Sequence, residues 1–170
     1  MQRILKYIIG ILTPLLMLFL LFHFFIGTYK IPSASMENTI MAGDTVFANH
    51  LSYKLSTISY GDIIVFQKDG KGDNLIKRVV GLPGDKIQIY DGRVYRNGTE
   101  VVEDYVIGNT LSVSNTDYTV PEDSVFVLGD NREDSNDSRY WDDAYVAMDD
   151  IIATAYFGFG FSPGFHIYYL

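Results

Sequence analysis

An uncharged stretch near the N-terminus constrains this chain more than any other feature. Residues 7–29 contain no acidic, lysine or arginine side chain. As an α-helix the stretch would be roughly 34 Å long, enough to cross the apolar core of a bilayer, which is about 30 Å thick. Arg3 and Lys6 precede it, and such a positive flank usually stays in the cytoplasm. We therefore expect a single-pass membrane protein, with residues 1–30 as cytoplasmic N-terminus and transmembrane anchor and residues 31–170 outside the cytoplasm.

An alternative interpretation is a signal peptide that is itself removed near Ala34 or Ser35. Ser33 and Ser35 resemble the small residues that precede such cleavage sites. The apolar core of a cleavable signal, however, is only about 7–15 residues long. The longer stretch found here favours an anchor that stays attached.

The charge balance and the absence of cysteine narrow the classes of partner. The formal net charge is −8, and the acidic residues lie outside the apolar stretch. Nucleic-acid partners require basic patches, so we expect none. Without cysteine there are no disulfides and no cysteine-ligated metal site.

After residue 31 no helical period stands out, and short runs rich in β-branched and aromatic residues follow one another. Asp91-Gly92 lies between two of these runs and Asn97-Gly98 follows the second, and both dipeptides are typical of tight turns. Residues 108–118 are polar and lack a period, which predicts a loop or insertion. We expect a mainly β fold, an antiparallel sheet that is barrel-like. The predicted strands are 44–50, 61–67, 74–81, 85–91, 93–98, 123–130 and, as the last, 151–161.

Several common types of site find no support in the sequence. The three histidines have no neighbouring serine or acid that would indicate a triad, and no pair has helical metal-ligand spacing. A calcium loop beginning at Asp134 would need glycine at its sixth position and glutamate at its twelfth, where Arg139 and Tyr145 stand. We therefore expect neither a metal nor a cofactor.

Lys77 and Arg78 lie in the middle of an apolar strand pattern, and both strand faces are apolar. Arginine does not lose its proton in proteins, whereas a buried lysine does so readily, with a pKa that can fall to about 5–6. A neutral Lys77 could thus act as a general base. Spacing alone favours a lysine that reaches solvent or pairs with an acid.

Serine needs a neighbouring base before its hydroxyl becomes a good nucleophile, and Ser-Lys pairs are a known solution. Ser35 lies in a loop of small residues directly after the apolar stretch. A single loop serine is more commonly a turn or capping residue. Ser35 alone therefore does not show whether it is a nucleophile or a turn residue.

Four segments in order resemble the type I signal peptidases. In that family a serine box follows the membrane anchor, and a short β box, a lysine box and a final acidic box come after it. The corresponding segments are "PSASM" (32–36), "GDIIVF" (61–66), "KRVVGLPGD" (77–85) and "GDNREDSNDSRYW" (129–141). The order of the boxes, the membrane anchor and the expected location of the β domain outside the cytoplasm all agree with this family. The resemblance extends from residue 1 to about residue 160.

The resemblance implies roles for the residues of the serine and lysine boxes. Ser35 corresponds to the nucleophile and Lys77 to the general base. The Ser33 hydroxyl and the Ser35 backbone N–H correspond to the oxyanion hole. Met36, which follows the nucleophile, is expected to contact substrate.

The final box implies supporting residues. Ser135 corresponds to the serine that orients the lysine, while Asp130, Asp137 and Arg139 correspond to structural groups around the site. The family's β fold carries a second, smaller β region, which is expected here within about residues 86–122. One departure is Asn38, because the family usually has proline at this position. Asparagine leaves the backbone more freedom there.

The implied function is a membrane-bound serine endopeptidase that removes signal peptides from exported preproteins at the lipid bilayer. Two alternative functions differ in what they require of the sequence. A self-cleaving Ser-Lys protease of the repressor type would need a DNA-binding region, which the anchor and the acidic charge oppose. A signal-peptidase-like domain that binds or assembles a secreted partner, such as a pilin, would not need intact Ser35 and Lys77.

Overall fold

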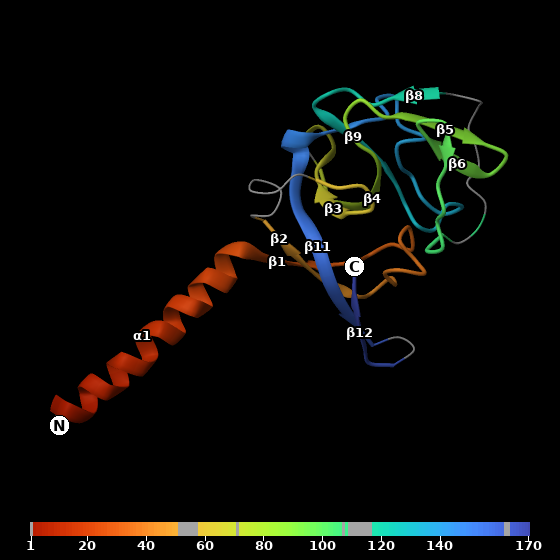
Figure 1. The fold of residues 1–170 in the computed structure, drawn as a ribbon. Helices are drawn as coiled ribbons and strands as arrows, with labels where there is room; N and C mark the ends of the chain where they lie inside the picture. The colour runs from red at the N-terminus through yellow and green to blue at the C-terminus, as the bar shows by residue number, and fades with distance from the viewer. Residues whose placement is uncertain (1, 51–57, 71, 107, 109–116, 162–163) are drawn as a thin grey trace.

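The computed structural model describes residues 2–50, 58–70, 72–106, 108, 117–161 and 164–170. A single long helix, α1 (Gln2–Phe25), projects away from a β domain that contains all the strands (Figure 1). The described side chains between Tyr7 and Phe19 on α1 are exposed. Within the described part of the chain, no helix meets both the length and the apolarity needed to span a membrane.

The helix ends earlier than the apolar stretch. Ile26–Lys30 form strand β1, which pairs antiparallel with β2 (Thr45–Asn49), with Thr28 opposite Phe47. The pairing continues to the helix end, because the His50 N–H donates to the Phe25 carbonyl at 3.0 Å. Ile, Thr and Tyr favour strands, and β2 provides partners for their backbone groups. The expected helix over residues 7–29 is therefore shortened at its C-terminal end.

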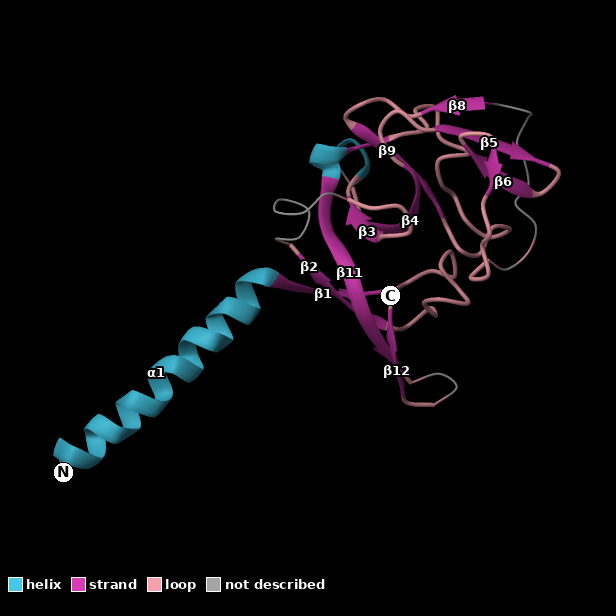
Figure 2. Cartoon of the chain, in the orientation of Figure 1, coloured by secondary structure: helices cyan, strands magenta, loops and turns pink. Residues whose placement is uncertain are grey.

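The larger sheet has eight strands, in the order β1-β2-β11-β3-β4-β9-β10, with β12 paired to β11. All its described pairs are antiparallel, and the registers of β11 and β4 are interrupted by bulges. Bulges bend a strand, and β11 is curved along its length (Figure 2). This confirms the mainly β, antiparallel class. The remaining strands of this sheet are β3 (Ile63–Phe66), β4 (Leu75–Gly81), β9 (Ser124–Leu128), β10 (Val146–Ala147), β11 (Ile151–Gly160) and β12 (His166–Tyr169).

Every predicted strand run corresponds to an observed strand, but the short strands β7 (Thr99–Glu100) and β10 (Val146–Ala147) were not predicted, and the C-terminus and the connections also differ. Residues 151–161 were expected to form the last strand, but β12 follows and pairs with the end of β11, Phe159 lying opposite Ile167. Two 3₁₀ turns, η1 (Lys68–Gly70) and η2 (Met148–Asp150), were not expected. Most of the predicted loop at 108–118 lies outside the described residues, and its end forms β8.

The smaller sheet has the strand order β7-β6-β5-β8, and its strands lie inside the expected interval 86–122. Asp91 and Gly92 both have positive φ (49° and 75°) and connect β5 to β6, as the dipeptide predicts. Asn97-Gly98 turns β6 into β7 in the same way. The strands are β5 (Lys86–Tyr90), β6 (Arg93–Arg96), β7 (Thr99–Glu100) and β8 (Asp117–Thr119).

The two sheets share a hydrophobic cluster. Val80 on β4 and Phe126 on β9 are fully buried together with Ile87 and Val94 of the smaller sheet. Two further clusters cover the remainder of the larger sheet. The smaller sheet is therefore packed directly on the strands that carry the predicted lysine and lead into the final box.

Candidate active site

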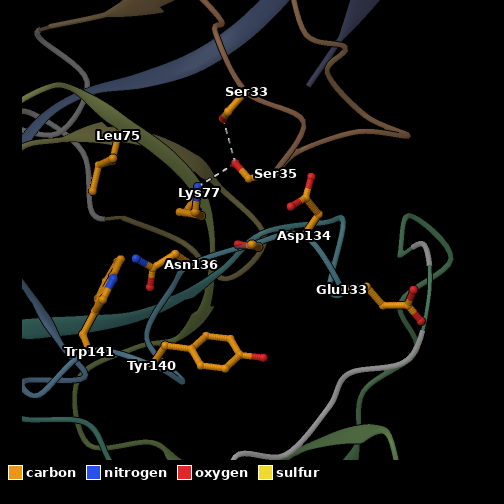
Figure 3. Close-up of a pocket in the computed structure, with 10 residues that line it drawn as sticks. Ser33, Ser35, Leu75, Lys77, Glu133, Asp134, Asn136, Tyr140 and Trp141 are labelled. Carbon is orange, nitrogen blue, oxygen red and sulfur yellow. Dashed lines mark hydrogen bonds between the residues drawn. The ribbon is translucent and has the colours of Figure 1, made fainter.

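Ser35 and Lys77 meet in the interior of the protein. Lys77 Nζ lies 2.8 Å from Ser35 Oγ, and both residues are buried, with 4% and 6% of their surface exposed (Figure 3). Lys77 projects from β4, opposite Ile64 of β3, whereas Ser35 lies in a turn that follows β1. The structure thus brings together two residues that are 42 positions apart in the sequence.

The environment of Lys77 makes its ammonium group easier to deprotonate than that of an exposed lysine. Burial lowers its pKa to about 8, and the negative charges of Asp137 and Asp130 limit the fall. The second contact of Nζ is with the Ile76 carbonyl at 2.9 Å. A neutral amine keeps two N–H donors and one lone pair. It can therefore donate to Ile76 while accepting the proton of the Ser35 hydroxyl.

The neighbouring Arg78 has a different role. Its Nε and Nη2 donate to the two carboxylate oxygens of Asp130 at 2.9 and 2.7 Å, and its Nη1 donates to the Gly61 carbonyl at 2.9 Å. The Thr39 hydroxyl also donates to Asp130. The strand pattern left open which of the two basic residues has the functional role, and the structure places Lys77, not Arg78, beside Ser35.

The serine loop, residues 33–40, is held by the segment that follows β9. Asn131 contributes twice, from its backbone N–H to the Ser35 carbonyl at 3.2 Å and from its side-chain amide to the Ala34 carbonyl at 3.1 Å. Gly129 packs so closely that an added Cβ would overlap the Ser35 carbonyl oxygen and the Ser135 hydroxyl. Glycine is needed there for close approach.

The residues expected to support the site form one buried network. Arg139 donates to both carboxylate oxygens of Asp137, at 2.8 and 2.9 Å, and both side chains are fully buried. The same carboxylate accepts from the Ser135 hydroxyl at 2.7 Å and from the Gly129 N–H at 3.0 Å. Ser135 thus donates to Asp137 in this structure, and its expected part in orienting Lys77 stays a prediction.

Ser33 lies beside the pair, with its Oγ 3.4 Å from Ser35 Oγ. Met36, in contrast, is completely buried in the core next to Ile31 and Ile40. It is absent from the described lining of the cavity that Ser35 faces, so a contact between Met36 and substrate would require the loop to move.

A cavity of about 640 Å³ opens in front of Ser35 and Lys77. Figure 3 shows Leu75 on one side, Trp141 and Tyr140 below and Glu133 at the far edge. Of the described histidines, His50 lies near Tyr29 and His166 near Asp44, and neither lines this cavity. The lining residues are Ser33, Ser35, Leu75, Lys77, Glu133, Asp134, Ser135, Asn136, Tyr140 and Trp141.

Asn38 is held in place. Its φ is +84°, and its side-chain amide donates to the Tyr105 carbonyl at 3.0 Å. Asparagine tolerates this left-handed region, whereas the proline ring fixes φ near −65°. The usual proline of the family could not adopt this conformation, and greater backbone freedom at Asn38 stays a prediction.

Sequence reasoning missed several residues around the site. The "GDNR" motif at the start of the final box contains three of them, Gly129, Asn131 and Arg132. This motif could have identified them as residues of the site. Glu103 and Tyr105 belong to the smaller β region and carry no motif. Their contacts with the site depend on the tertiary fold.

The chain matches the family described as signal peptidase, peptidase S26, over residues 4–159. The chain belongs to this signal peptidase family. The chain is therefore a serine endopeptidase, which confirms the expected enzyme class.

Two relatives compared by sequence agree with the family assignment. Probable signal peptidase I-1 of Synechocystis sp. is 37% identical over 160 residues, which are 89% of this chain and 80% of that protein. Signal peptidase IB of Staphylococcus aureus is 32% identical over 176 residues, covering 93% of this chain and 90% of that protein. The crystal structure of a signal peptidase I from Enterococcus faecalis V583 is 33% identical, covers 58% of this chain and 97% of that chain, and gives a TM-score of 0.48.

Proposed function

We propose that this signal peptidase removes signal peptides from exported preproteins, with Ser35 as nucleophile and Lys77 as general base. The observation that carries the proposal is the 2.8 Å separation between Ser35 Oγ and a lysine amine whose pKa burial lowers to about 8. This distance lies within hydrogen-bond reach of a general base. The cavity in front of the pair provides space for a peptide.

The reaction begins when neutral Lys77 takes the proton of the Ser35 hydroxyl and the oxygen attacks the scissile carbonyl. The protonated amine then gives its proton to the leaving amine, which releases the mature protein. Lys77, again neutral, takes a proton from water as the water oxygen attacks the acyl carbonyl. The protonated amine then returns this proton to Ser35 Oγ, which leaves as its bond to the acyl carbon breaks and frees the signal peptide. Each proton taken by Lys77 is therefore returned within the cycle.

The negative oxygen formed during attack needs hydrogen-bond donors. The Ser33 hydroxyl and the Ser35 backbone N–H are the proposed donors, and the 3.4 Å between the two serine hydroxyls supports the assignment of Ser33. One donor of this kind is typically worth about 3–4 kcal/mol in the transition state.

We further propose that the enzyme works at the membrane, anchored by α1. The exposed apolar side chains along α1 support this proposal. A second support is an aromatic surface on β2, β11 and β12, where Phe47 stacks on Phe157 at a ring-centroid distance of 4.6 Å. Large exposed apolar surfaces indicate contact with membranes or partners. The surface also includes Phe159, Phe161, Phe165 and Ile167.

The dyad is tested by incubating the full chain, purified in detergent, with a preprotein and measuring the initial rate of cleavage. Ser35→Ala and Lys77→Ala should each lower the rate by roughly 1000-fold or more. Lys77→Arg should be equally inactive, because arginine cannot be deprotonated. Lys86→Ala, at an exposed lysine of β5, is the matched control and should cleave normally. Normal cleavage by any of the Lys77 variants would refute the assignment.

Membrane attachment is tested on cells that express the full chain. After alkaline carbonate treatment, the protein should remain in the membrane pellet, as an integral membrane protein does. Protease added to intact spheroplasts should digest the β domain, because it is proposed to face outward. Recovery of the full-length protein in the soluble fraction would contradict the anchor.

A further inference from the structure

Residues 101–106 follow the last turn of the smaller sheet, and we call this segment the strap. The strap contacts the serine loop, the lysine strand β4 and the final acidic box. We propose that Glu103 and Tyr105 of the strap are positioning residues that hold the serine loop in register with the lysine strand. This inference rests on the proposed Ser35–Lys77 dyad. It gives the smaller sheet a role in catalysis that no motif in its sequence indicates.

The first contact holds the serine loop. The Asn38 amide donates to the Tyr105 carbonyl at 3.0 Å, which connects two residues 67 positions apart. Asn38 lies three residues beyond Ser35, within a turn in which the Ile40 N–H donates to the Met36 carbonyl at 2.8 Å. A displacement of the strap at Tyr105 would therefore be transmitted to the turn that carries Ser35.

The second contact covers the lysine strand. The Tyr105 ring lies over the Arg78 guanidinium, 4.0 Å from its centroid to Cζ, in a cation–π contact. Arg78 is joined to Lys77 by a peptide bond, and its edge is occupied by Asp130 and the Gly61 carbonyl. The ring thus closes the face of the guanidinium that these hydrogen bonds leave uncovered.

The third contact reaches the final box. Arg132 donates to both carboxylate oxygens of Glu103, at 2.9 and 2.6 Å, and both side chains are almost fully buried. Arg132 Nε also donates to the Gly129 carbonyl at 3.0 Å, directly where the chain packs on Ser35. Within the strap, the Tyr105 hydroxyl donates to Glu103 at 3.0 Å.

These contacts make the strap a cross-connection between three segments that approach Ser35 and Lys77 from different directions. Burial, followed by the charge of Glu103, raises the pKa of Tyr105, so its phenol remains a hydrogen-bond donor across the working pH range. A misplacement of about 1 Å at a reacting group can cost about 100-fold in rate. Loss of the strap contacts should therefore appear in the chemical step more than in substrate binding.

The experiment compares Tyr105→Ala, Tyr105→Phe and Arg93→Ala in the full chain, using cleavage of a peptide substrate at a temperature well below each variant's melting point. Arg93 forms an exposed ion pair with Glu100 in the same sheet and is the matched control. Tyr105→Ala should lower kcat about tenfold with KM unchanged. Both Tyr105 variants keep the backbone carbonyl that Asn38 contacts, but Tyr105→Phe also keeps the ring over Arg78 and should restore most of the rate. Arg93→Ala should equal the wild type.

A second variant tests the same connection from the loop side. Asn38→Gly accepts a positive φ and removes only the amide donor, so it should lower kcat in the same direction as Tyr105→Ala. If the two residues act through one connection, the double variant should lose less than the product of the single losses. Fully multiplicative losses would overturn the connection between Asn38 and Tyr105.

The outcomes separate this inference from the proposed dyad. Wild-type kcat in Tyr105→Ala, alongside inactive Ser35→Ala and Lys77→Ala, overturns the positioning role and leaves the dyad standing. An activity loss that merely follows the folded fraction measured by circular dichroism also overturns it. An active Ser35→Ala variant would instead refute the dyad itself.

Discussion

The guanidinium of Arg78 makes two parallel hydrogen bonds with the carboxylate of Asp130, at 2.9 and 2.7 Å. Asp130 is completely buried, and it follows Gly129, which packs on Ser35. The pair therefore joins the lysine strand to the final box immediately behind the proposed dyad. It also makes the stability of the fold sensitive to Arg78.

Replacing Arg78 by alanine would leave the buried Asp130 without its charge partner. We expect Arg78→Ala to lower the free energy of unfolding by about 3–5 kcal/mol. The measurement is urea unfolding in detergent, followed by the fluorescence of Trp141, the one tryptophan of the sequence. Arg93→Ala, at an exposed pair, should change stability by less than about 1 kcal/mol. Equal effects from both variants would contradict the structural importance of Asp130.

Activity should depend on pH through Lys77. The pKa of this residue is lowered to about 8, and only the neutral amine can act as the base. Below pH 8, kcat/KM should therefore fall about tenfold for each pH unit, and above it the rate should level off. The measurement is a pH profile with a peptide that does not titrate between pH 6 and 9.5. A flat profile over this interval would argue against a titrating lysine base.

The lowered pKa of Lys77 also reduces the stability of the folded protein. The folded-state pKa lies below the ordinary value of 10.5, so the unfolded chain holds this proton more tightly. The cost is complete below about pH 8 and disappears as the pH rises towards 10.5. Lys77→Met should thus be more stable than the wild type at pH 7, by about 3 kcal/mol.

This stability difference between Lys77→Met and the wild type should shrink between pH 8 and 10.5, as urea unfolding at several pH values can determine. Lys86→Met provides the reference for an exposed lysine and should show no such trend. A Lys77→Met variant that is less stable than the wild type at pH 7 would show that the amine contributes more through its contacts than burial costs.

Gly129 should tolerate no side chain. In Gly129→Ala the new methyl group would overlap the Ser35 carbonyl and Ser135, so the serine loop must shift. We expect activity to fall about 100-fold and stability by about 1–3 kcal/mol. Gly164→Ala, where an added Cβ meets no neighbouring atom, is the control and should leave both quantities unchanged. Full activity in Gly129→Ala would mean that the loop adapts without losing alignment.

Local sequence signals were sufficient for much of the fold. Short runs rich in β-branched and aromatic residues predicted the main strands, and Asp91-Gly92 predicted the hairpin between β5 and β6 correctly. Both depend on residues close in the sequence. The end of α1 and the return strand β12 were missed. In both cases the decisive factor is pairing with a distant strand, which adds backbone hydrogen bonds that no local pattern contains.

The residues of the candidate site that belong to sequence motifs could be predicted. Ser33, Ser35, Lys77 and Ser135 were named from the sequence, and all four line the same cavity. The different orientations of Lys77 and Arg78 could not be derived from two equally apolar strand faces. The role of Tyr105 could not be predicted for another reason. Its backbone carbonyl contacts a loop that is distant in the sequence, and its ring contacts the face of a guanidinium group.

The junction between α1 and β1 has no linker, since the helix ends at Phe25 and the strand begins at Ile26. In an enzyme anchored by α1, the height of Ser35 above the lipid would consequently be a fixed length. A preprotein whose scissile bond emerges at another height would escape cleavage whatever its side chains. Inserting a few flexible residues at this junction would widen the range of heights and, with it, the range of preproteins that are cut.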